Sequence, residues 1–160
     1  MTHPCIAVVG PGENATEEAI DDALLVGRRI AEHGWVMICG GRAAGVMAAA
    51  ARGVHAAGGV SVGVLPGTDR LGASTDLTLA IPTGLGEARN AVIVNAADAI
   101  IACGMNPGTA SEVAFALRAA KPAVLVRPTA ETAAFFLSLG SMPPAPSPDS
   151  ERRQRSPRSA

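Results

Sequence analysis

Three segments of this chain run from an apolar stretch into a glycine-containing turn that opens a predicted helix. The turns begin at Gly10, Gly40 and Gly104, after stretches rich in Val, Ile, Ala and Cys. Such stretches are typical of strands buried in a parallel sheet. Turns that follow neighbouring parallel strands lie at one edge of the sheet, and helices that begin there present free N–H groups and a partial positive charge. The pattern therefore predicts an anion-binding edge on an open α/β fold.

The alternation of short apolar stretches with helical patterns continues over most of the chain. It predicts an α/β fold with a Rossmann-like, doubly wound parallel sheet in a single domain that spans residues 1–140. The predicted strands occupy residues 5–9, 36–39, 60–65, 77–81, 99–103 and 123–126. The first predicted helix follows an N-cap at Asn14 and ends at Gly34, and the others cover residues 46–57, 87–96, 109–119 and 128–139.

The segment 141–160 differs from the rest, because it holds five prolines and four arginines and little that could enter a core. A segment of this kind cannot bury enough apolar surface to offset the entropy that it loses on ordering. We predict a disordered, solvated tail.

Composition limits the class of partner. Aromatic residues make up 2% of the chain against 48% hydrophobic residues, and the formal net charge is −1. The core must therefore be built from Ala, Val, Ile and Leu. The chain offers neither a broad basic surface nor the aromatic platforms that single-stranded nucleic acid needs, so we expect no nucleic-acid partner.

The cysteines indicate a reducing compartment. Cys5, Cys39 and Cys103 all fall in predicted strands, and their spacing fits neither a disulfide framework nor a local metal knuckle. We interpret them as small buried apolar residues and expect no catalytic metal. No apolar run approaches the ~18 residues of a membrane span, and the N-terminus does not look like a leader. These features predict a cytoplasmic protein without a membrane partner.

The first two turns offer candidate phosphate ligands. Gly10 and Gly12 fit a loose dinucleotide fingerprint, but no acidic residue ends the second predicted strand, which argues against an ordinary nicotinamide enzyme. A merely tight turn is the alternative. In the second turn, glycines allow a ligand to approach the backbone and Arg42 supplies a guanidinium suited to phosphate or carboxylate. The alternative is that Gly40 and Gly41 only turn the chain and that Arg42 is solvated. The candidate residues of this turn are Gly40, Gly41, Arg42, Gly45, Val46 and Met47.

The third turn carries the most specific pattern. We expect a helix to begin at Gly108 and Thr109, with their N–H groups and the Thr109 hydroxyl directed at the sheet edge. Asn106 is suited to a left-handed backbone conformation in the turn. Glu112 lies one turn into that helix, where it is either a functional carboxylate or a charge that favours the helix dipole. The candidate binding residues here are Met105, Asn106, Pro107, Gly108 and Thr109.

A fourth segment, Thr83 and Gly84 followed by an apolar helix that contains Arg89, is a further candidate. A cation on an otherwise apolar helix usually has a partner or a ligand. We expect Arg89 and Glu112 to face each other across the pocket.

These residues resemble a Rossmann-type superfamily once labelled lysine decarboxylases, which includes the cytokinin-activating nucleoside-monophosphate phosphoribohydrolases. The resemblance covers roughly residues 5–127, and the hydrolase Arg and Glu are matched by Arg89 and Glu112. The chain is more similar to the molybdenum-cofactor carrier proteins, although Asn106 stands where that pattern has another glycine. The segments that carry this similarity are residues 33–35, 40–42, 45–47, 63–67, 83–89 and 104–110.

The resemblance implies two hypotheses. The first is a homo-oligomer, a dimer or tetramer, that stores or delivers the phosphorylated molybdenum cofactor without transforming it. The alternative is a phosphoribohydrolase that cleaves the N-glycosidic bond of a nucleoside 5′-monophosphate, with Arg89 and Glu112 as its catalytic residues. The predicted helices at 87–96 and 109–119 are apolar on more than one face, which also favours at least a dimer.

Overall fold

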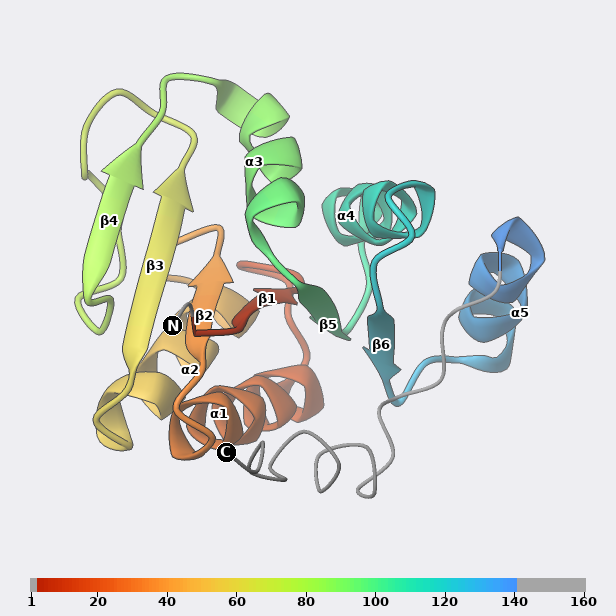
Figure 1. Cartoon of the computed structure of the whole chain (residues 1–160), viewed down its shortest axis with the longest axis horizontal. Coiled ribbons are helices and arrows are strands. Elements are labelled where there is room, and N and C mark those ends of the chain that lie inside the picture. Colours follow the sequence, from red (N-terminus) through yellow and green to blue (C-terminus); the bar gives the residue numbers. More distant parts are fainter. Residues whose placement is uncertain (1–2, 141–160) are drawn as a thin grey trace, which may run out of the picture.

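A fully parallel, six-stranded sheet forms the centre of the molecule, in the spatial order β4-β3-β2-β1-β5-β6 (Figure 1). The computed structural model describes residues 3–140, so the predicted disordered tail at 141–160 lies outside the described residues. The strands are β1 (Cys5–Val9), β2 (Val36–Cys39), β3 (Val60–Leu65), β4 (Leu79–Pro82), β5 (Ala99–Cys103) and β6 (Ala123–Val126).

Helices cover both faces of this sheet. They are α1 (Glu17–Glu32), α2 (Gly45–Ala56), α3 (Arg89–Ala96), α4 (Pro107–Arg118) and α5 (Ala130–Leu139), with a short 3-10 helix η1 (Gly86–Ala88) before α3. Buried side chains of α1 and α2 pack on one face, and those of α3, α4 and α5 pack on the other. The predicted doubly wound, Rossmann-like α/β domain is confirmed. None of these described helices combines the length and hydropathy needed to cross a bilayer.

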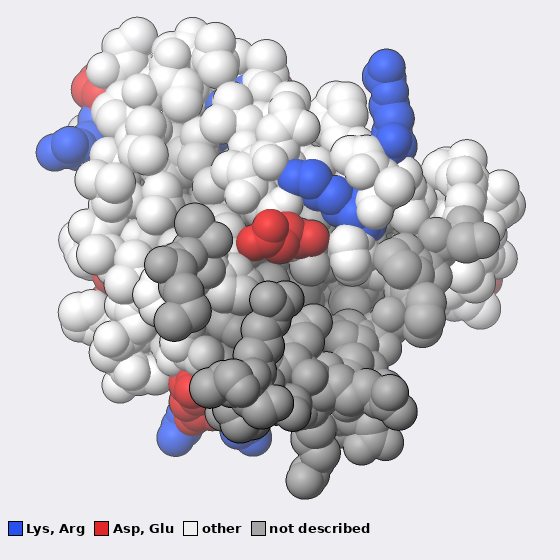
Figure 2. Space-filling view, viewed as in Figure 1, with Lys and Arg blue, Asp and Glu red and all other residues white. Residues whose placement is uncertain are grey.

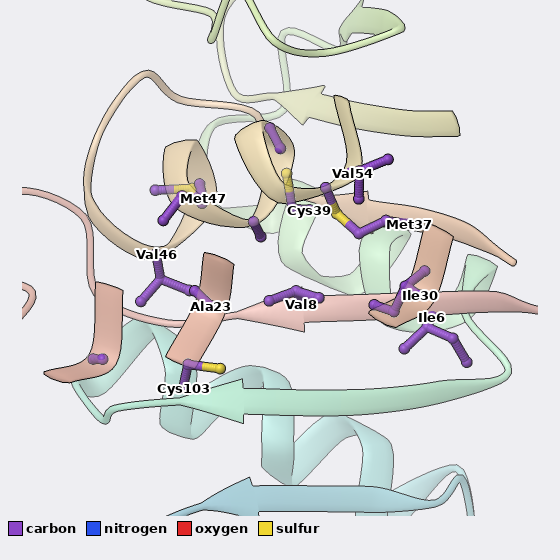
Figure 3. Close-up of a cluster of buried hydrophobic side chains, with 14 residues drawn as sticks. Ile6, Val8, Ala23, Ile30, Met37, Cys39, Val46, Met47, Val54 and Cys103 are labelled. Atoms are coloured by element: carbon purple, nitrogen blue, oxygen red, sulfur yellow. The ribbon is translucent and has the colours of Figure 1, made fainter. Parts of the chain in front are cut away.

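Alternation along β1 separates the two cores. Ile6 and Val8 belong to the core beneath α1 and α2, whereas Ala7 and Val9 belong to the core beneath α3 and α4. Figure 3 shows Ile6 and Val8 among the side chains of the first of these cores. This period of two, with both faces apolar, is what burial on both sides of a parallel strand requires.

Close packing of α1 against α2 explains the abundance of small residues. A Cβ added at Gly27 of α1 would collide with the Ala50 carbonyl oxygen, and one added at Gly53 of α2 would collide with the Leu24 carbonyl oxygen. The two backbones therefore approach each other without intervening side chains. The resulting core needs little aromatic volume, consistent with the composition.

The predicted boundaries differ from the structure mainly at helix starts. The N-cap of α1 is Thr16 rather than Asn14, because the Thr16 hydroxyl accepts the Ala19 N–H at 3.2 Å. Helix α4 starts at Pro107, two positions before the predicted start, since proline fits the first turn of a helix. Strand β4 runs from Leu79 to Pro82 rather than over residues 77–81.

The order of the strands creates a crevice. Strand β1 pairs with β2 on one side and with β5 on the other, so the connections from β1 and β5 leave toward opposite faces of the sheet. The segments after the carboxyl ends of β1 and β5 therefore diverge. This switch point is where doubly wound sheets bind their ligands.

Candidate functional site

A cavity of about 260 Å³ lies at this switch point. Its lining comes from the end of β1, from all three glycine turns, from η1 and from the N-terminal parts of α2, α3 and α4. The lining residues are Val8, Val9, Gly10, Gly12, Glu13, Asn14, Gly40, Arg42, Ala44, Met47, Glu87, Arg89, Asn90, Asn106, Gly108, Thr109 and Glu112. The three turns, separated by up to about a hundred residues in the sequence, thus meet at one cavity.

Many of the candidate residues line this cavity and others lie outside its lining. Those in the lining are Gly10, Gly12, Gly40, Arg42, Met47, Arg89, Asn106, Gly108, Thr109 and Glu112. Those outside it are Gly41, Gly45, Val46, Thr83, Gly84, Met105 and Pro107. Thr83 and Gly84 are instead tied to the end of β3, because the Thr83 hydroxyl donates to the Leu65 carbonyl at 2.7 Å and the Gly84 N–H donates to Gly67. Met105 lines a separate cavity beside β6 and α5.

Two glycines are required by the geometry of the second turn. Gly45 has φ of +50°, and a Cβ there would collide with the carbonyl oxygens of Pro11 and Gly12. This close approach lets the Val46 N–H donate to the Pro11 carbonyl at 3.0 Å, which fixes α2 against the first turn. A Cβ at Gly40 would stand 2.6 Å from a terminal nitrogen of Arg89, so the absent side chain makes room for that guanidinium.

Arg89 is the main cation buried in the cavity. It begins α3, is only 6% exposed, and its Nε has no hydrogen-bond partner within residues 3–140. A guanidinium remains charged in any protein environment, and burial without a partner is expensive. The arrangement therefore favours an anionic ligand at this guanidinium.

Glu112 shares the cavity with Arg89, as expected, but the pair is not a direct ion pair: within the described chain, no Arg89 nitrogen comes within 4.0 Å of a Glu112 carboxylate oxygen. Glu112 is 6% exposed, and burial raises its pKa to about 7, against the opposing influence of the Arg89 charge. The Glu87 carboxylate adds to the increase. Near neutral pH the Glu112 carboxyl group can therefore either donate or accept a hydrogen bond.

The third turn differs from its prediction in two respects. Asn106 is extended, with φ of −151° and ψ of 176°, and it is Gly104 that adopts the left-handed conformation at φ of +77°. Asn106 serves as the N-cap of α4. Its Oδ1 accepts the Thr109 N–H at 2.8 Å and the Thr109 hydroxyl at 2.9 Å. The Thr109 donors are therefore engaged by the chain itself, whereas the sequence predicted that they point toward a ligand.

The rim carries charges that the sequence analysis did not select. Glu13 and Glu87 are exposed, and Glu13 stands 4.0 Å from the half-exposed Arg42 guanidinium. Asn90, beside Arg89 in the same helix, is 6% exposed and also lines the cavity. The sequence signal that could have pointed to Asn90 is its place directly after Arg89 in an otherwise apolar helix. For the rim glutamates the available indication was position: Glu13 follows Gly12 in the first turn, and Glu87 lies between Gly84 and Arg89.

The cysteines behave mostly as predicted. Cys39 and Cys103 are buried free thiols, and burial raises the pKa of Cys39 to about 11 and that of Cys103 to about 12. Both thiols are protonated at neutral pH and pack as small apolar groups. Cys5 is half-buried rather than buried. Within residues 3–140, no group of three or more His, Cys, Asp or Glu residues is placed to hold a metal ion.

Comparison with known proteins agrees with this architecture. The profile of the SLOG cluster4 family matches residues 3–143. The chain belongs to the SLOG cluster4 family. An uncharacterised protein of Archaeoglobus fulgidus is 42% identical to this chain over 123 residues, which are 77% of this chain and 80% of that protein.

Two solved structures are similar to this SLOG cluster4 protein in both fold and sequence. One is a molybdenum cofactor binding protein from Rippkaea orientalis, 42% identical with a TM-score of 0.86, covering 87% of this chain and 85% of that one. The other is a Moco carrier protein from Chlamydomonas reinhardtii, 44% identical with a TM-score of 0.81, covering 86% and 85%. The resemblance inferred from the sequence motifs is confirmed.

Proposed function

We propose that this SLOG cluster4 protein binds the phosphorylated molybdenum cofactor and stores or delivers it without chemical turnover. The observation that carries the proposal is the Arg89 guanidinium, buried in the cavity at the switch point with its Nε unpartnered among the described residues. The likeness to the Rippkaea and Chlamydomonas proteins supports this cofactor as the ligand. In this proposal the cofactor is cargo, and the protein supplies binding and orientation only.

The lining of the cavity fits such a ligand. A phosphate monoester would be bound by Arg89, by the Gly108 N–H at the start of α4, and by Arg42 at the rim. The pterin would lie beside Gly10 and Gly12 of the first turn, both of which line the cavity. Cargo binding of this kind needs firm but reversible contacts, and the mixture of a buried and an exposed arginine can provide them.

The alternative, hydrolysis of a nucleoside 5′-monophosphate by Arg89 and Glu112, predicts that free base is released. A glycosidic transition state is stabilised by an ionised carboxylate near the ribose, and with its pKa raised by burial to about 7 Glu112 is partly ionised near neutral pH, so this group by itself does not separate the two functions. The two similar solved structures support the carrier rather than the hydrolase. Incubation with AMP or cytokinin monophosphates separates the two, because a carrier releases no free base.

Titration with isolated molybdenum cofactor, followed by fluorescence, tests the proposal. The wild-type protein should bind saturably, and Arg89→Gln should weaken binding on the order of 100-fold, because a charge-assisted, bidentate contact is lost. Arg52→Gln is the matched control: Arg52 is an exposed arginine on α2 outside the cavity lining. Equal affinity of the wild type and Arg89→Gln, with both folded, would contradict the proposal.

We also propose that the protein works in the cytoplasm as a homo-oligomer. A groove between α3 and α4 is lined by Ala91, Asn95, Phe115, Arg118 and Ala119. Val92 on α3 is 40% exposed and Phe115 in the groove is 41% exposed. Figure 2 shows a mostly uncharged surface over α3, with basic side chains over α4. A second copy would cover this face. Light scattering that reports a monomer at micromolar concentration would refute the oligomer without affecting the ligand proposal.

A further inference from the structure

We propose that Asn106 is an internal occupant of the anion site, whose side-chain oxygen holds the place of a ligand oxygen until a phosphate displaces it. The proposal rests on the proposed function in one respect: it concerns the same cavity and a phosphorylated ligand. It adds a residue that sets the affinity of the cavity for phosphate and its preference for anions over neutral ligands.

The geometry at the start of α4 indicates that the Asn106 side chain occupies the position of a ligand oxygen. Two donors, the N–H and the hydroxyl of Thr109, converge on a single acceptor, Asn106 Oδ1, at 2.8 Å and 2.9 Å. Thr109 is 1% exposed, so these donors have little access to water and require an acceptor at that point. A phosphate oxygen placed at a helix N-terminus would use the same pair of donors.

Arg89 provides an independent indication that an anion belongs here. Asn106, Thr109 and Arg89 line the same cavity, and the buried Arg89 Nε has no partner among residues 3–140. The Asn106 carboxamide satisfies Thr109, but it is neutral and so does not compensate the guanidinium charge. A phosphate would do both, because its oxygens can accept from Thr109 while its charge lies beside Arg89.

The Asn106 side chain can be displaced because it lies next to solvent. Asn106 is exposed, so its carboxamide can rotate into water and exchange its two protein hydrogen bonds for hydrogen bonds to solvent. A neutral ligand would form bonds no stronger than those that it replaces. An anion forms charge-assisted ones, so the exchange favours phosphate.

Titration calorimetry with inorganic phosphate, at constant ionic strength, tests this inference on the full-length chain. Asn106→Gly removes the internal acceptor and should bind phosphate on the order of tenfold more tightly, since two hydrogen bonds no longer have to be broken. Glycine is nearly as good an N-cap as asparagine, so the helix should be retained. Asn106→Asp keeps the cap but places a carboxylate where phosphate must bind, and should weaken phosphate binding at least tenfold.

The matched control is Thr129→Gly. Thr129 caps α5 by accepting the Thr132 N–H at 3.2 Å, and it lies outside the cavity lining. This variant should bind phosphate as the wild type does. Unchanged or weaker phosphate binding by folded Asn106→Gly, including no binding at millimolar phosphate, overturns the inference.

The result is separable from that of the cofactor titration. If the wild type binds molybdenum cofactor but Asn106→Gly gains no affinity for phosphate, the inference about Asn106 fails and the proposed function stands. If Asn106→Gly binds phosphate more tightly while no variant binds the cofactor, the anion site stands and the proposed ligand is wrong.

Discussion

Replacing Glu112 with glutamine should change how the stability of this protein depends on pH. Glu112 is buried, and its pKa is about 7 in the folded protein against an ordinary value of 4.5. The folded state therefore holds a proton on Glu112 that the unfolded state has already released. The stabilising contribution of the protonated group is fully present below about pH 4.5 and is lost as the pH rises through about 7.

The magnitude follows from the two pKa values. Each pH unit between them corresponds to about 1.4 kcal/mol, so ionising Glu112 in the folded protein lowers the free energy of unfolding by about 3 kcal/mol. The attraction of the Arg89 charge is already contained in the pKa of about 7. Between about pH 5 and pH 8.5 most of this change, roughly 2–3 kcal/mol, should be measurable.

Urea denaturation at the two pH values measures the effect, with the fluorescence of Trp35, the single tryptophan of the chain, as the signal. The difference in free energy of unfolding between Glu112→Gln and the wild type should shift in favour of the variant by roughly 2–3 kcal/mol between pH 5 and pH 8.5. Glu17→Gln, an exposed glutamate in the first turn of α1, is the control and should follow the wild-type pH profile. Parallel profiles for the wild type and Glu112→Gln would refute the assignment of a raised pKa to this carboxyl.

Two further substitutions test how the fold positions the site. Gly45→Ala should lower the free energy of unfolding by at least ~2 kcal/mol, because φ is +50° and the new Cβ would meet carbonyl oxygens of the first turn. The control Gly34→Ala, at φ of +70° with open space around it, should lower it by about 1 kcal/mol. Equal losses would show that the close approach at Gly45 is unimportant. Lys121→Met should cost about 2 kcal/mol in urea denaturation, because the Lys121 ammonium donates to three backbone carbonyls at the end of α3, at 2.6–2.8 Å. Arg52→Met, at an exposed position, should change stability by less than ~0.5 kcal/mol, and a similar loss in both variants would mean that those bonds contribute nothing specific.

Strand positions were predictable because each apolar run borders a glycine or a proline that breaks the chain. Strands β3 and β6 have the predicted bounds, since glycine or proline stands directly beside their apolar runs. Helix starts were less predictable because several residues near each start can serve as the cap. Asn14 and Thr16 are both good N-caps, and the path of the chain after β1 decides in favour of Thr16.

The candidate site was predictable in outline for a related reason. Parallel strands require the turns after them to lie at one edge, so glycine turns following apolar strands had to gather there. That Arg89 would be buried in the same cavity followed from the apolar helix around it. The sequence could not indicate that Thr109 donates to Asn106, because the alternative acceptor, a ligand oxygen, satisfies the same donors.

Local chemistry along the chain was enough to specify the α/β class and the succession of elements and to predict an anion-binding edge, because hydrophobic period, glycine turns and helix starts act over a few residues. Three-dimensional packing alone settled which residues of those turns line the cavity, which carboxyl has its pKa raised by burial, and which donors are engaged by the chain itself. Those properties depend on burial and on distances between residues far apart in the chain, and neither exists until the sheet and its helices have assembled.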